Sequence, residues 1–408
     1  MCKEKMFISA YACEPNRGSE IGIGWNWVLQ LSKQFELWVL TRRSNKENIE
    51  QWRKNNSTGE DIHFVYYDTP RILRFWKKGL RGVRTYYAIW QTMTNRIVRT
   101  TMKENDIKIY HLLTYGNSLW KASRYGMKKF FVWGPTGGVD LIPREFVHYY
   151  GFKFKVREIV RTIIIKTLKI NFGFAKRCWK ANIILCKSES MIKVIPKKYK
   201  YKAIIFTDGA VNEKLLSVPN VRNGETVEYV TVGNLDAWRN FDVLIEAFCK
   251  AYEHNNKIRL TIVGKGNDFD RLTSLIKIRK MEDVITVTGQ VPMEKYFMLL
   301  KQSDVVINPS YKEGAVTMAF DTMAMSKPFI CFETGGYTRN LDENCAIILK
   351  AGNRERMIES LERAISKLES EEVRKTYANN MHKKALENTW AKKGEEVCRI
   401  ISSKYSDK

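Results

Sequence analysis

The chain has 408 residues, of which 44% are hydrophobic and 28% charged, and its formal net charge at pH 7 is +25. This length favours two or more domains, and nothing in the composition is of low complexity. The cysteines and histidines are dispersed and form no pattern of zinc ligands. The charge favours an anionic partner such as nucleic acid, a phospholipid surface or a phosphorylated substrate.

Apolar runs that read as strands alternate with helical patterns along most of the chain. In the first half the predicted strands are 6–11, 37–41, 63–67, 109–113, 130–133 and 183–186. In the second half they are 228–232, 259–263, 284–287, 305–308, 329–332 and 346–349. This alternation predicts two parallel sheets, each covered by helices on both faces.

A stretch rich in Gly, Asn, Pro, Ser and Asp, residues 207–224, reads as a linker between the two halves. We therefore expect one domain at 1–206, a second at 225–385 and a helical ending at 386–408. We find no signal peptide pattern, and the apolar cluster at 159–170 contains basic residues and falls short of the roughly 20 apolar residues of a spanning helix. These features predict a cytoplasmic protein.

Two segments combine basic residues with an apolar helical pattern. No acidic residue lies between Asp68 and Glu104. In that window Leu73, Trp76, Leu80, Val83, Tyr87 and Trp90 recur at helical spacing, beside Arg74, Lys77, Lys78, Arg81 and Arg84. Basic amphipathic helices with aromatic faces suit a membrane bearing anionic lipid. We therefore predict that 71–100 contacts such a membrane, with 152–180 as a second candidate. The alternative is a packed helix whose basic side is solvated.

Three features of the first half lie at predicted strand ends. The first strand leads through a loop with Gly18 into a helix, a geometry that accepts phosphate, although no G-x-G-x-x-G dinucleotide motif is present. His111 lies near the tip of the fourth strand, where a lone histidine is more often a hydrogen-bonded core residue than a catalyst. The fifth strand exits into an irregular turn with Gly134, Gly137 and Gly138, where backbone can approach a substrate closely.

The segment 304–336 reads as strand, polar loop, helix and strand. Its loop carries Glu313 and its helix carries Asp321. Ligands of parallel sheets bind at the carboxyl ends of strands, and the N–H groups at a helix start suit an anion such as a diphosphate. The alternative is an ordinary β-α-β unit with a capping glutamate and a solvated aspartate.

This segment resembles the signature of retaining glycosyltransferases of family 4, which have the GT-B fold of two Rossmann-like domains facing a cleft. The matching features are, in order, Pro309-Ser310, Glu313, Asp321, Met323-Ala324 and Pro328. The GSE-x-G-x-GW run at Gly18 and the Gly-Pro-x-Gly-Gly turn at Gly134 also resemble the family. The chain departs from it at Asp321, where the family has Glu. It departs further at Asn234, Arg239 and Asn240, where the family has Arg, Lys and Gly.

The resemblance implies transfer of a sugar from a nucleotide-sugar, UDP- or GDP-linked, to a saccharide acceptor with retention of anomeric configuration. It implies that Glu313 and His111 are catalytic and face the donor sugar, and that Asp321 bonds the ribose. The implied nucleotide-sugar-binding residues are Gly18, Asn234, Arg239, Gly289, Val291, Gly314, Ala315, Val316 and Asp321. The implied acceptor loop holds Gly134, Gly137 and Gly138. We expect no metal and no cofactor, because cations and helix ends would carry the diphosphate charge.

The basic surface predicts a lipid-linked acceptor, a role in cell-surface polysaccharide assembly and peripheral association with the inner face of the plasma membrane. Two alternatives remain open. One is a sugar-nucleotide epimerase, which can share the fold. The other is a non-catalytic GT-B subunit that binds a membrane or a partner enzyme, which Asn234 and Asp321 would support. Nucleic-acid binding is not predicted, because no reading motif is present.

Overall fold

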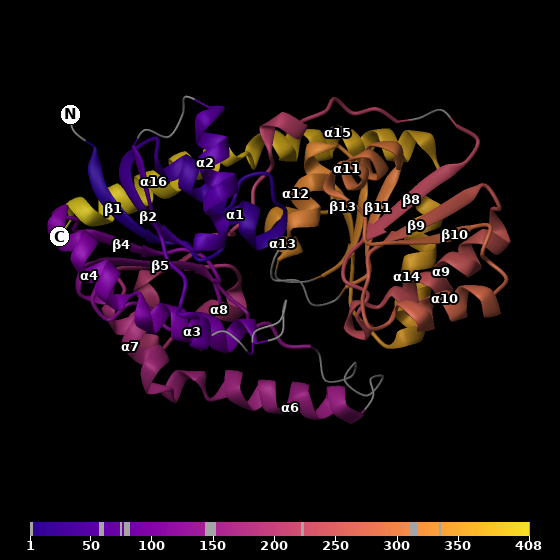
Figure 1. The fold of residues 1–408 in the computed structure, drawn as a ribbon. Coiled ribbons are helices and arrows are strands. Elements are labelled where there is room, and N and C mark those ends of the chain that lie inside the picture. Colours follow the sequence, from indigo (N-terminus) through magenta and orange to yellow (C-terminus); the bar gives the residue numbers. More distant parts are fainter. Residues whose placement is uncertain are drawn as a thin grey trace. The chain divides into compact units, whose positions relative to one another are not determined.

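The computed structural model describes residues 3–56, 61–73, 76, 82–142, 152–221, 224–310, 316–333 and 336–407 (Figure 1). The chain divides into two compact units. The first unit comprises Met1–Val139, Ile163–Asp208 and Trp390–Lys408, and the second comprises Asp140–Thr162 and Gly209–Thr389. One division falls inside helix α6 (Phe152–Lys166).

A seven-stranded sheet with the order β3-β2-β1-β4-β5-β6-β7 forms the centre of the first unit, and every neighbouring pair is parallel. The strands are β1 (Glu4–Ser9), β2 (Phe35–Thr41), β3 (Ile62–Tyr66), β4 (Ile109–Leu112), β5 (Phe130–Thr136), β6 (Ile183–Cys186) and β7 (Ala203–Ile205). Strands β4, β5 and β6 are buried along their whole length, which explains their continuous apolar sequences. The short edge strand β7 was not predicted, because its three residues follow a run of Lys and Tyr.

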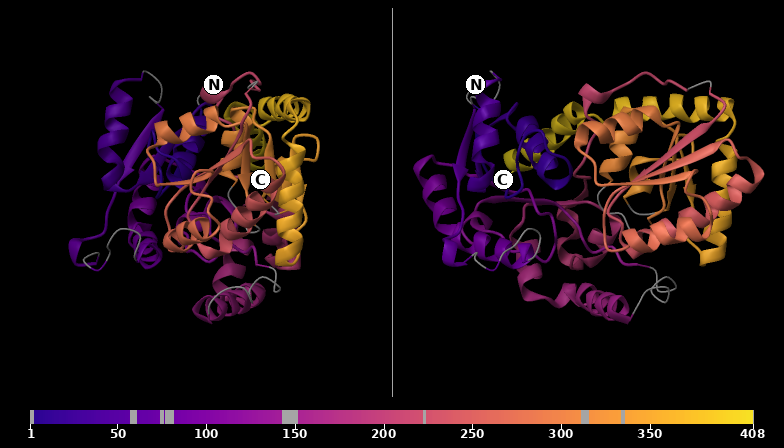
Figure 2. Two further views of the ribbon diagram at one scale, coloured as in Figure 1. Left: turned by 90° about the vertical axis from the view of Figure 1, so that its right-hand side faces the viewer. Right: turned by 45° about the vertical axis from the view of Figure 1, so that its right-hand side comes forward.

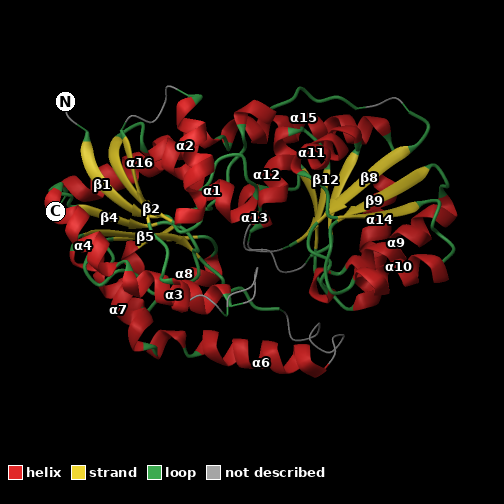
Figure 3. Cartoon of the chain, in the orientation of Figure 1, coloured by secondary structure: helices red, strands yellow, loops and turns green. Residues whose placement is uncertain are grey.

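Helices cover both faces of this sheet (Figures 1 and 3). One face carries α1 (Ser19–Leu31), α2 (Lys46–Lys54) and α16 (Trp390–Ser406); the other carries α3 (Val83–Met93), α4 (Asn95–Glu104), α7 (Phe172–Lys180) and α8 (Glu189–Val194). Successive side chains of β3 point to opposite faces of the sheet. Phe64 stacks on Trp25 of α1 on one face, and Val65 packs on the other face in the cluster that contains residues of α3 and α4. Helix α16 lies against α1, where Gly394 meets the side chain of Gln30.

The second unit has a six-stranded parallel sheet with the order β10-β9-β8-β11-β12-β13. The strands are β8 (Val227–Val232), β9 (Ile258–Val263), β10 (Ile285–Gly289), β11 (Val305–Asn308), β12 (Phe329–Phe332) and β13 (Ala346–Leu349). One face packs against α9 (Phe241–His254), α10 (Phe269–Ile278) and α14 (Arg354–Lys367), and the other against α11 (Met293–Gln302), α12 (Thr317–Ala324) and α15 (Glu371–Glu387). The layers of this unit are visible in both views of Figure 2. The predicted fold class, two α/β domains with parallel sheets, is therefore confirmed.

The segment 71–100 differs from the predicted membrane-facing helix. It begins with a short turn at Arg71–Leu73, and helix α3 starts only at Val83. Trp90 is fully buried, and its indole N–H donates to the carbonyl of Tyr67 at 2.9 Å, so placing Trp90 at a lipid interface was wrong. Helical spacing of aromatic residues indicates burial against an apolar phase, and here that phase is the protein core. The basic residues Arg74, Lys77, Lys78 and Arg81 lie outside the described residues.

Candidate functional site

At the carboxyl edge of the second sheet, the loops that follow β8 and β9 lie directly against each other. The amide of Leu235 donates to the carbonyl of Lys265 at 3.0 Å, and the amide of Asp268 donates to the carbonyl of Leu235 at 2.9 Å. A Cβ placed on Gly264 would come within 1.8 Å of the Gly233 carbonyl oxygen, and Gly264 has a φ of +151°. The glycines of this turn therefore permit a close backbone contact that any side chain would block.

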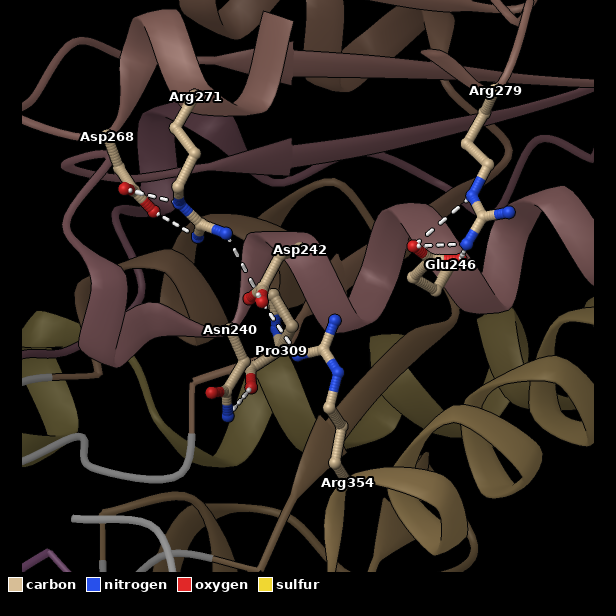
Figure 4. Close-up of polar contacts among 8 residues, drawn as sticks. All are labelled: Asn240, Asp242, Glu246, Asp268, Arg271, Arg279, Pro309 and Arg354. Carbon is tan, nitrogen blue, oxygen red and sulfur yellow. Dashed lines mark hydrogen bonds and ion pairs between the residues drawn. The ribbon is translucent and has the colours of Figure 1, made fainter. Parts of the chain in front are cut away.

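The loop after β8 ends in a 3-10 turn, Ala237–Arg239, and Asn240 then begins helix α9. Asn240 has a φ of +59°, in the left-handed region that Gly and Asn tolerate best. Its side-chain amide donates to the Pro309 carbonyl at 3.2 Å, which ties this loop to the end of β11 (Figure 4). The asparagine at the family's glycine position thus keeps the required backbone conformation and adds a bond.

The positively charged guanidinium of Arg239 lies near the end of β8. Its guanidinium carbon lies 4.7 Å from the ring centroid of Trp238, and a Cβ on Gly233 would lie 3.2 Å from its Nη1 atom. The neighbouring Asn234 is exposed, and its carbonyl accepts from the amide of Asp236 at 2.9 Å. A guanidinium beside the N-terminus of α9 gives this edge two features that attract a phosphate.

An ion-pair network fixes the start of α9 (Figure 4). Asp242, in the first turn, lies 2.7 Å from Arg354 of α14 and 3.6 Å from Arg271 of α10, and Arg271 also bonds Asp268 at 2.8 Å. The sequence did not reveal this network, because its members come from three separate helices. Its two arginines offset the negative charge of Asp242, so the helix start stays suited to an anion.

Asp321 lies on α12 and is partly buried. Burial raises its carboxyl pKa to about 7, and the hydrogen bond that Tyr296 donates to Oδ2 at 2.8 Å partly opposes this rise. This carboxylate therefore titrates near neutral pH. Of the predicted loop residues, Val316 is buried just before α12, whereas Glu313, Gly314 and Ala315 lie outside the described residues.

Gly289 ends β10 with a φ of +73°, and an added Cβ there would meet nothing within 4 Å. Its carbonyl accepts from the amide of Gly264 at 2.9 Å, so the ends of β9 and β10 are joined. Val291 is partly buried against the cluster that contains α12. The loops after β8, β9 and β10 and the end of β11 thus bring glycine turns and a cation together, while Asp321 lies on the neighbouring helix α12, bonded to Tyr296 of α11. This set can accept a phosphorylated nucleotide.

In the first unit, α1 begins with Gly18 as its N-cap, and no side chain caps the helix. Ser19, the first residue of α1, takes a left-handed conformation with a φ of +56°. A Cβ on Gly22 would lie 1.9 Å from the Arg17 carbonyl oxygen. A Cβ on Gly24 would lie 2.0 Å from the Ala12 carbonyl oxygen. The G-x-G spacing therefore lets the first turns of α1 pack directly on the preceding loop.

A cluster of charges lies at the carboxyl edge of the first sheet. Glu20 accepts hydrogen bonds from the amides of Tyr115 at 2.9 Å and Gly116 at 3.4 Å. Lys187, just after β6, forms a buried ion pair with Asp208 and lies 3.8 Å from Glu20. The sequence did not predict this cluster. The only signal was the glutamate of the GSE run, because Lys187 and Asp208 lie in segments with no motif.

His111 is fully buried in β4. Its Nε2 atom lies 2.7 Å from the Gly134 carbonyl oxygen, so Nε2 carries the proton and donates it there. Burial lowers the His111 pKa to about 4, which keeps the ring neutral near pH 7. His111 therefore supports the turn that follows β5.

The turns after β4 and β5 are also bonded to each other. The amide of Gly137 donates to the Gly116 carbonyl at 2.7 Å, and the amide of Ser118 donates to the Gly137 carbonyl at 3.0 Å. Gly134 and Gly138 have φ values of +116° and +78°, as the irregular turn requires. The structure thus brings the predicted acceptor loop together with the loop that Glu20 holds.

Residues 213–384 match the family model described as glycosyl transferases group 1. The match lies within the second unit and covers less than half of the chain. Among curated relatives, the chain is 30% identical over 175 residues to an uncharacterised glycosyltransferase, MJ1069, of Methanocaldococcus jannaschii, covering 42% of this chain and 43% of the relative. It is also 30% identical over 87 residues to the putative teichuronic acid biosynthesis glycosyltransferase TuaC of Bacillus subtilis, covering 21% of each. The chain thus spans less than half the length of these two relatives.

Solved structures match over nearly the whole chain and establish the GT-B fold. Sucrose-phosphate synthase from Thermosynechococcus elongatus gives a TM-score of 0.69 at 13% identity, with full coverage of both chains. WaaG, a glycosyltransferase involved in lipopolysaccharide biosynthesis, gives 0.60 at 13% identity and covers 97% of this chain and 99% of its own. Anabaena HepE in complex with UDP and glucose gives 0.61 at 11% identity, covering 98% and 100%.

Proposed function

We propose that the protein is a glycosyltransferase that moves a sugar from a nucleotide-sugar donor to a saccharide acceptor with retention of anomeric configuration. The observation that carries this proposal is the arrangement at the carboxyl edge of the second sheet, inside the segment that matches the group 1 family model. There, a positioned guanidinium, a helix N-terminus and close backbone turns face the same strand ends. We assign donor binding to 225–385 and acceptor binding to 1–206, with 207–224 as linker and 386–408 as the helix that returns to the first domain.

The donor diphosphate would be held by Arg239, Asn234 and the backbone of 314–316. Asp321 would accept a hydrogen bond from a ribose hydroxyl, and the backbone of 289–291 would contact the base. Each role follows from chemistry that these groups can perform, since guanidinium and amide N–H groups bind phosphate oxygens and a carboxylate binds hydroxyls. We propose that no metal is needed, because these cationic and dipolar groups can offset the diphosphate charge.

For the sugar, we propose that Glu313 is the catalytic carboxylate next to the reacting carbon. We propose that His111 also serves catalysis. Its bond to the Gly134 carbonyl favours a positioning role, in which it fixes the turn of Gly134, Gly137 and Gly138. A neutral, buried imidazole suits that role, because it holds one tautomer across the physiological pH range.

We further propose a lipid-linked saccharide acceptor at the inner face of the plasma membrane and a role in cell-surface polysaccharide assembly. The net charge of +25 supports an anionic lipid surface. The named roles of WaaG in lipopolysaccharide and of TuaC in teichuronic acid biosynthesis point the same way for those relatives. None of the helices in the described part of the chain is long and apolar enough to cross a bilayer.

Thermal unfolding with added nucleotide tests donor binding. A ligand that binds only the folded state raises the melting temperature, so UDP or GDP should stabilise the protein in the presence of a chelator. UDP comes first, because HepE was solved with UDP and glucose. Stabilisation that disappears in chelator and returns with manganese would refute the metal-free mechanism. If no nucleotide stabilises the protein, the alternative of a non-catalytic GT-B subunit is favoured. The departures from the family at Asn234 and Asp321 support that alternative.

Transfer itself is tested with labelled UDP-sugars and a membrane lipid extract. We expect label to move into the lipid phase only when protein, donor and extract are all present. Conversion of the donor sugar into an epimer without extract would instead identify a sugar-nucleotide epimerase. Nucleotide binding with neither reaction would reduce the second unit to a binding module.

A further inference from the structure

Helix α6 turns most of its apolar residues toward solvent. The exposed side chains are Phe152, Val156, Ile159, Val160, Ile163 and Ile164, which we call the α6 apolar face. Ile159 and Ile163 keep 55% and 57% of their surface exposed. At 3.6 residues per turn, the six side chains occupy one arc about 140° wide. The apolar stripe of a surface helix normally faces the protein core, so α6 has the reverse arrangement.

The other side of α6 makes the contacts with the protein. Glu158 and Ile165 are buried there. Arg161 donates to the carbonyl of Asp140 at 2.7 Å and lies 3.4 Å from the Glu158 carboxylate. These residues recur at helical spacing opposite the α6 apolar face. Hydrogen bonds and an ion pair therefore contribute to holding the helix in the orientation that exposes its isoleucines and valines.

Basic residues border the α6 apolar face on both sides. At 3.6 residues per turn, Lys155 and Lys166 fall along one edge and Arg157 along the other. The segment 152–180 has nine basic residues and a single acidic one, the buried Glu158. Lysine and arginine stems can lie along an apolar surface while their charged ends reach outward. The edges of the helix are thus suited to anionic groups around an apolar phase.

The chain beyond α6 continues the same composition. Ile170, at the end of the 3-10 turn Leu168–Ile170, and Phe172, at the start of α7, expose 82% and 79% of their surface. Trp179 of α7 is more than half exposed, and the Lys180 ammonium lies 4.2 Å from its ring centroid. Aromatic side chains of this kind favour the boundary between hydrocarbon and headgroups.

We propose that the α6 apolar face and its flanking cations dock into the interface of a membrane that carries anionic lipid. A 15-residue helix that is apolar on one side and basic at its edges lies in the plane of such an interface, with its apolar side among the acyl chains. A second copy of this chain is a poorer occupant, because it would place two strongly basic segments against each other. An anionic bilayer offers the apolar phase and also neutralises the charge.

This docking deepens the proposed function, since it names the surface that would bring the enzyme to a lipid-linked acceptor. It also replaces the segment 71–100 as the primary membrane contact, because Tyr87 and Trp90 of that segment belong to the core. Docking does not depend on sugar transfer, so the two can fail separately.

Co-sedimentation of the full chain with phosphatidylcholine vesicles, with and without phosphatidylglycerol, tests the proposal. The test variant is the double substitution Ile159→Asn and Ile163→Asn, which removes apolar contact without changing charge. The matched control is Ile278→Asn, at another exposed isoleucine, on α10. We expect the wild type and the control to bind the anionic vesicles and the double variant to bind at least tenfold more weakly. Added salt should weaken the binding of the wild type.

Several results would overturn the proposal: no binding by the wild type, equal binding by the double variant, or equal binding to both kinds of vesicle. A dimer of the wild type that dissociates in the double variant would show that a second copy covers the face. Stabilisation by UDP in the double variant serves as the independent readout. If vesicle binding is lost while stabilisation by UDP remains, the fold and the donor site are intact.

Discussion

The raised pKa of Asp321 predicts that Asp321→Asn stabilises the protein, and that the gain grows with pH. The folded state holds this carboxyl at a pKa of about 7, against an ordinary value of 3.8. The folded protein therefore binds more protons than the unfolded chain between these values, and its stability falls as pH rises through that window. Asparagine has the same shape, stays neutral and can still accept the hydrogen bond of Tyr296.

The two pKa values set an upper limit on the gain. With one pKa unit equal to about 1.4 kcal/mol, the limit is about 2 kcal/mol at pH 5 and about 4 kcal/mol at pH 8. Asp321 is partly accessible to solvent, so we expect roughly half of each figure. If Asp321 also binds the ribose, the same substitution should abolish stabilisation by UDP. Wild-type affinity for UDP should then fall as pH drops below 7, because protonation removes an acceptor.

The assay is urea unfolding of the wild type and Asp321→Asn at pH 5 and pH 8, with and without UDP. Asp283→Asn is the matched control, since it removes an exposed carboxylate from the same unit. A gain that is equal at both pH values, or a loss of stability at pH 8, would refute the reasoning from burial. If UDP stabilises Asp321→Asn as much as it stabilises the wild type, Asp321 does not bind the ribose. The reasoning from burial would not be affected by that result.

Three further predictions concern the same unit. Glu313→Gln should abolish sugar transfer while leaving the melting temperature and the UDP shift unchanged; near-normal turnover would reduce Glu313 to a structural acid. Asn234→Arg should maintain or increase UDP affinity, because a charge-assisted bond contributes on the order of 1.5–3 kcal/mol, and a large loss in titration calorimetry would show a site built around asparagine. Asn240→Ala should lower the free energy of unfolding by about 2–3 kcal/mol, through left-handed strain and the lost bond to Pro309, and Asn240→Gly by about 1 kcal/mol. Equal losses in urea unfolding would contradict the conformational argument.

Strands β6, β11 and β12 were predictable because each is buried along its whole length and reads as a short, almost wholly apolar run. The helical spacing of Tyr87 and Trp90 was also recognised, but spacing cannot distinguish a protein core from lipid as the apolar phase. The exposed face of α6 shows the converse case, where the same kind of pattern faces outward. The burial of Ile165 and the contacts of Glu158 and Arg161 on its other side show the orientation, which the sequence pattern does not.

The site was predictable where the backbone conformation requires a particular residue type, as in the glycine turns at Gly134 and Gly289. It was not predictable where it depends on residues far apart in sequence. Asp242 and Arg354 are separated by more than a hundred residues, and no motif links them. Asn240 shows a further limit: the sequence marks it only as a departure from the family's glycine, whereas the structure shows that its left-handed conformation and its bond to Pro309 preserve the turn.

The composition of the first unit has a consequence for biosynthesis. Its last segment, Trp390–Lys408, is made only after the ribosome has passed about 180 residues beyond Asp208, which takes roughly 10–40 s at ordinary elongation rates. During that interval the surface of α1 around Gln30 is not covered by α16, because Gly394 and its neighbours have not yet been synthesised. The nascent first unit therefore exposes an unfinished apolar layer to chaperones while the second unit can already fold. A nonsense mutation before Trp390 should consequently destabilise the first unit, although most of its residues precede the mutation.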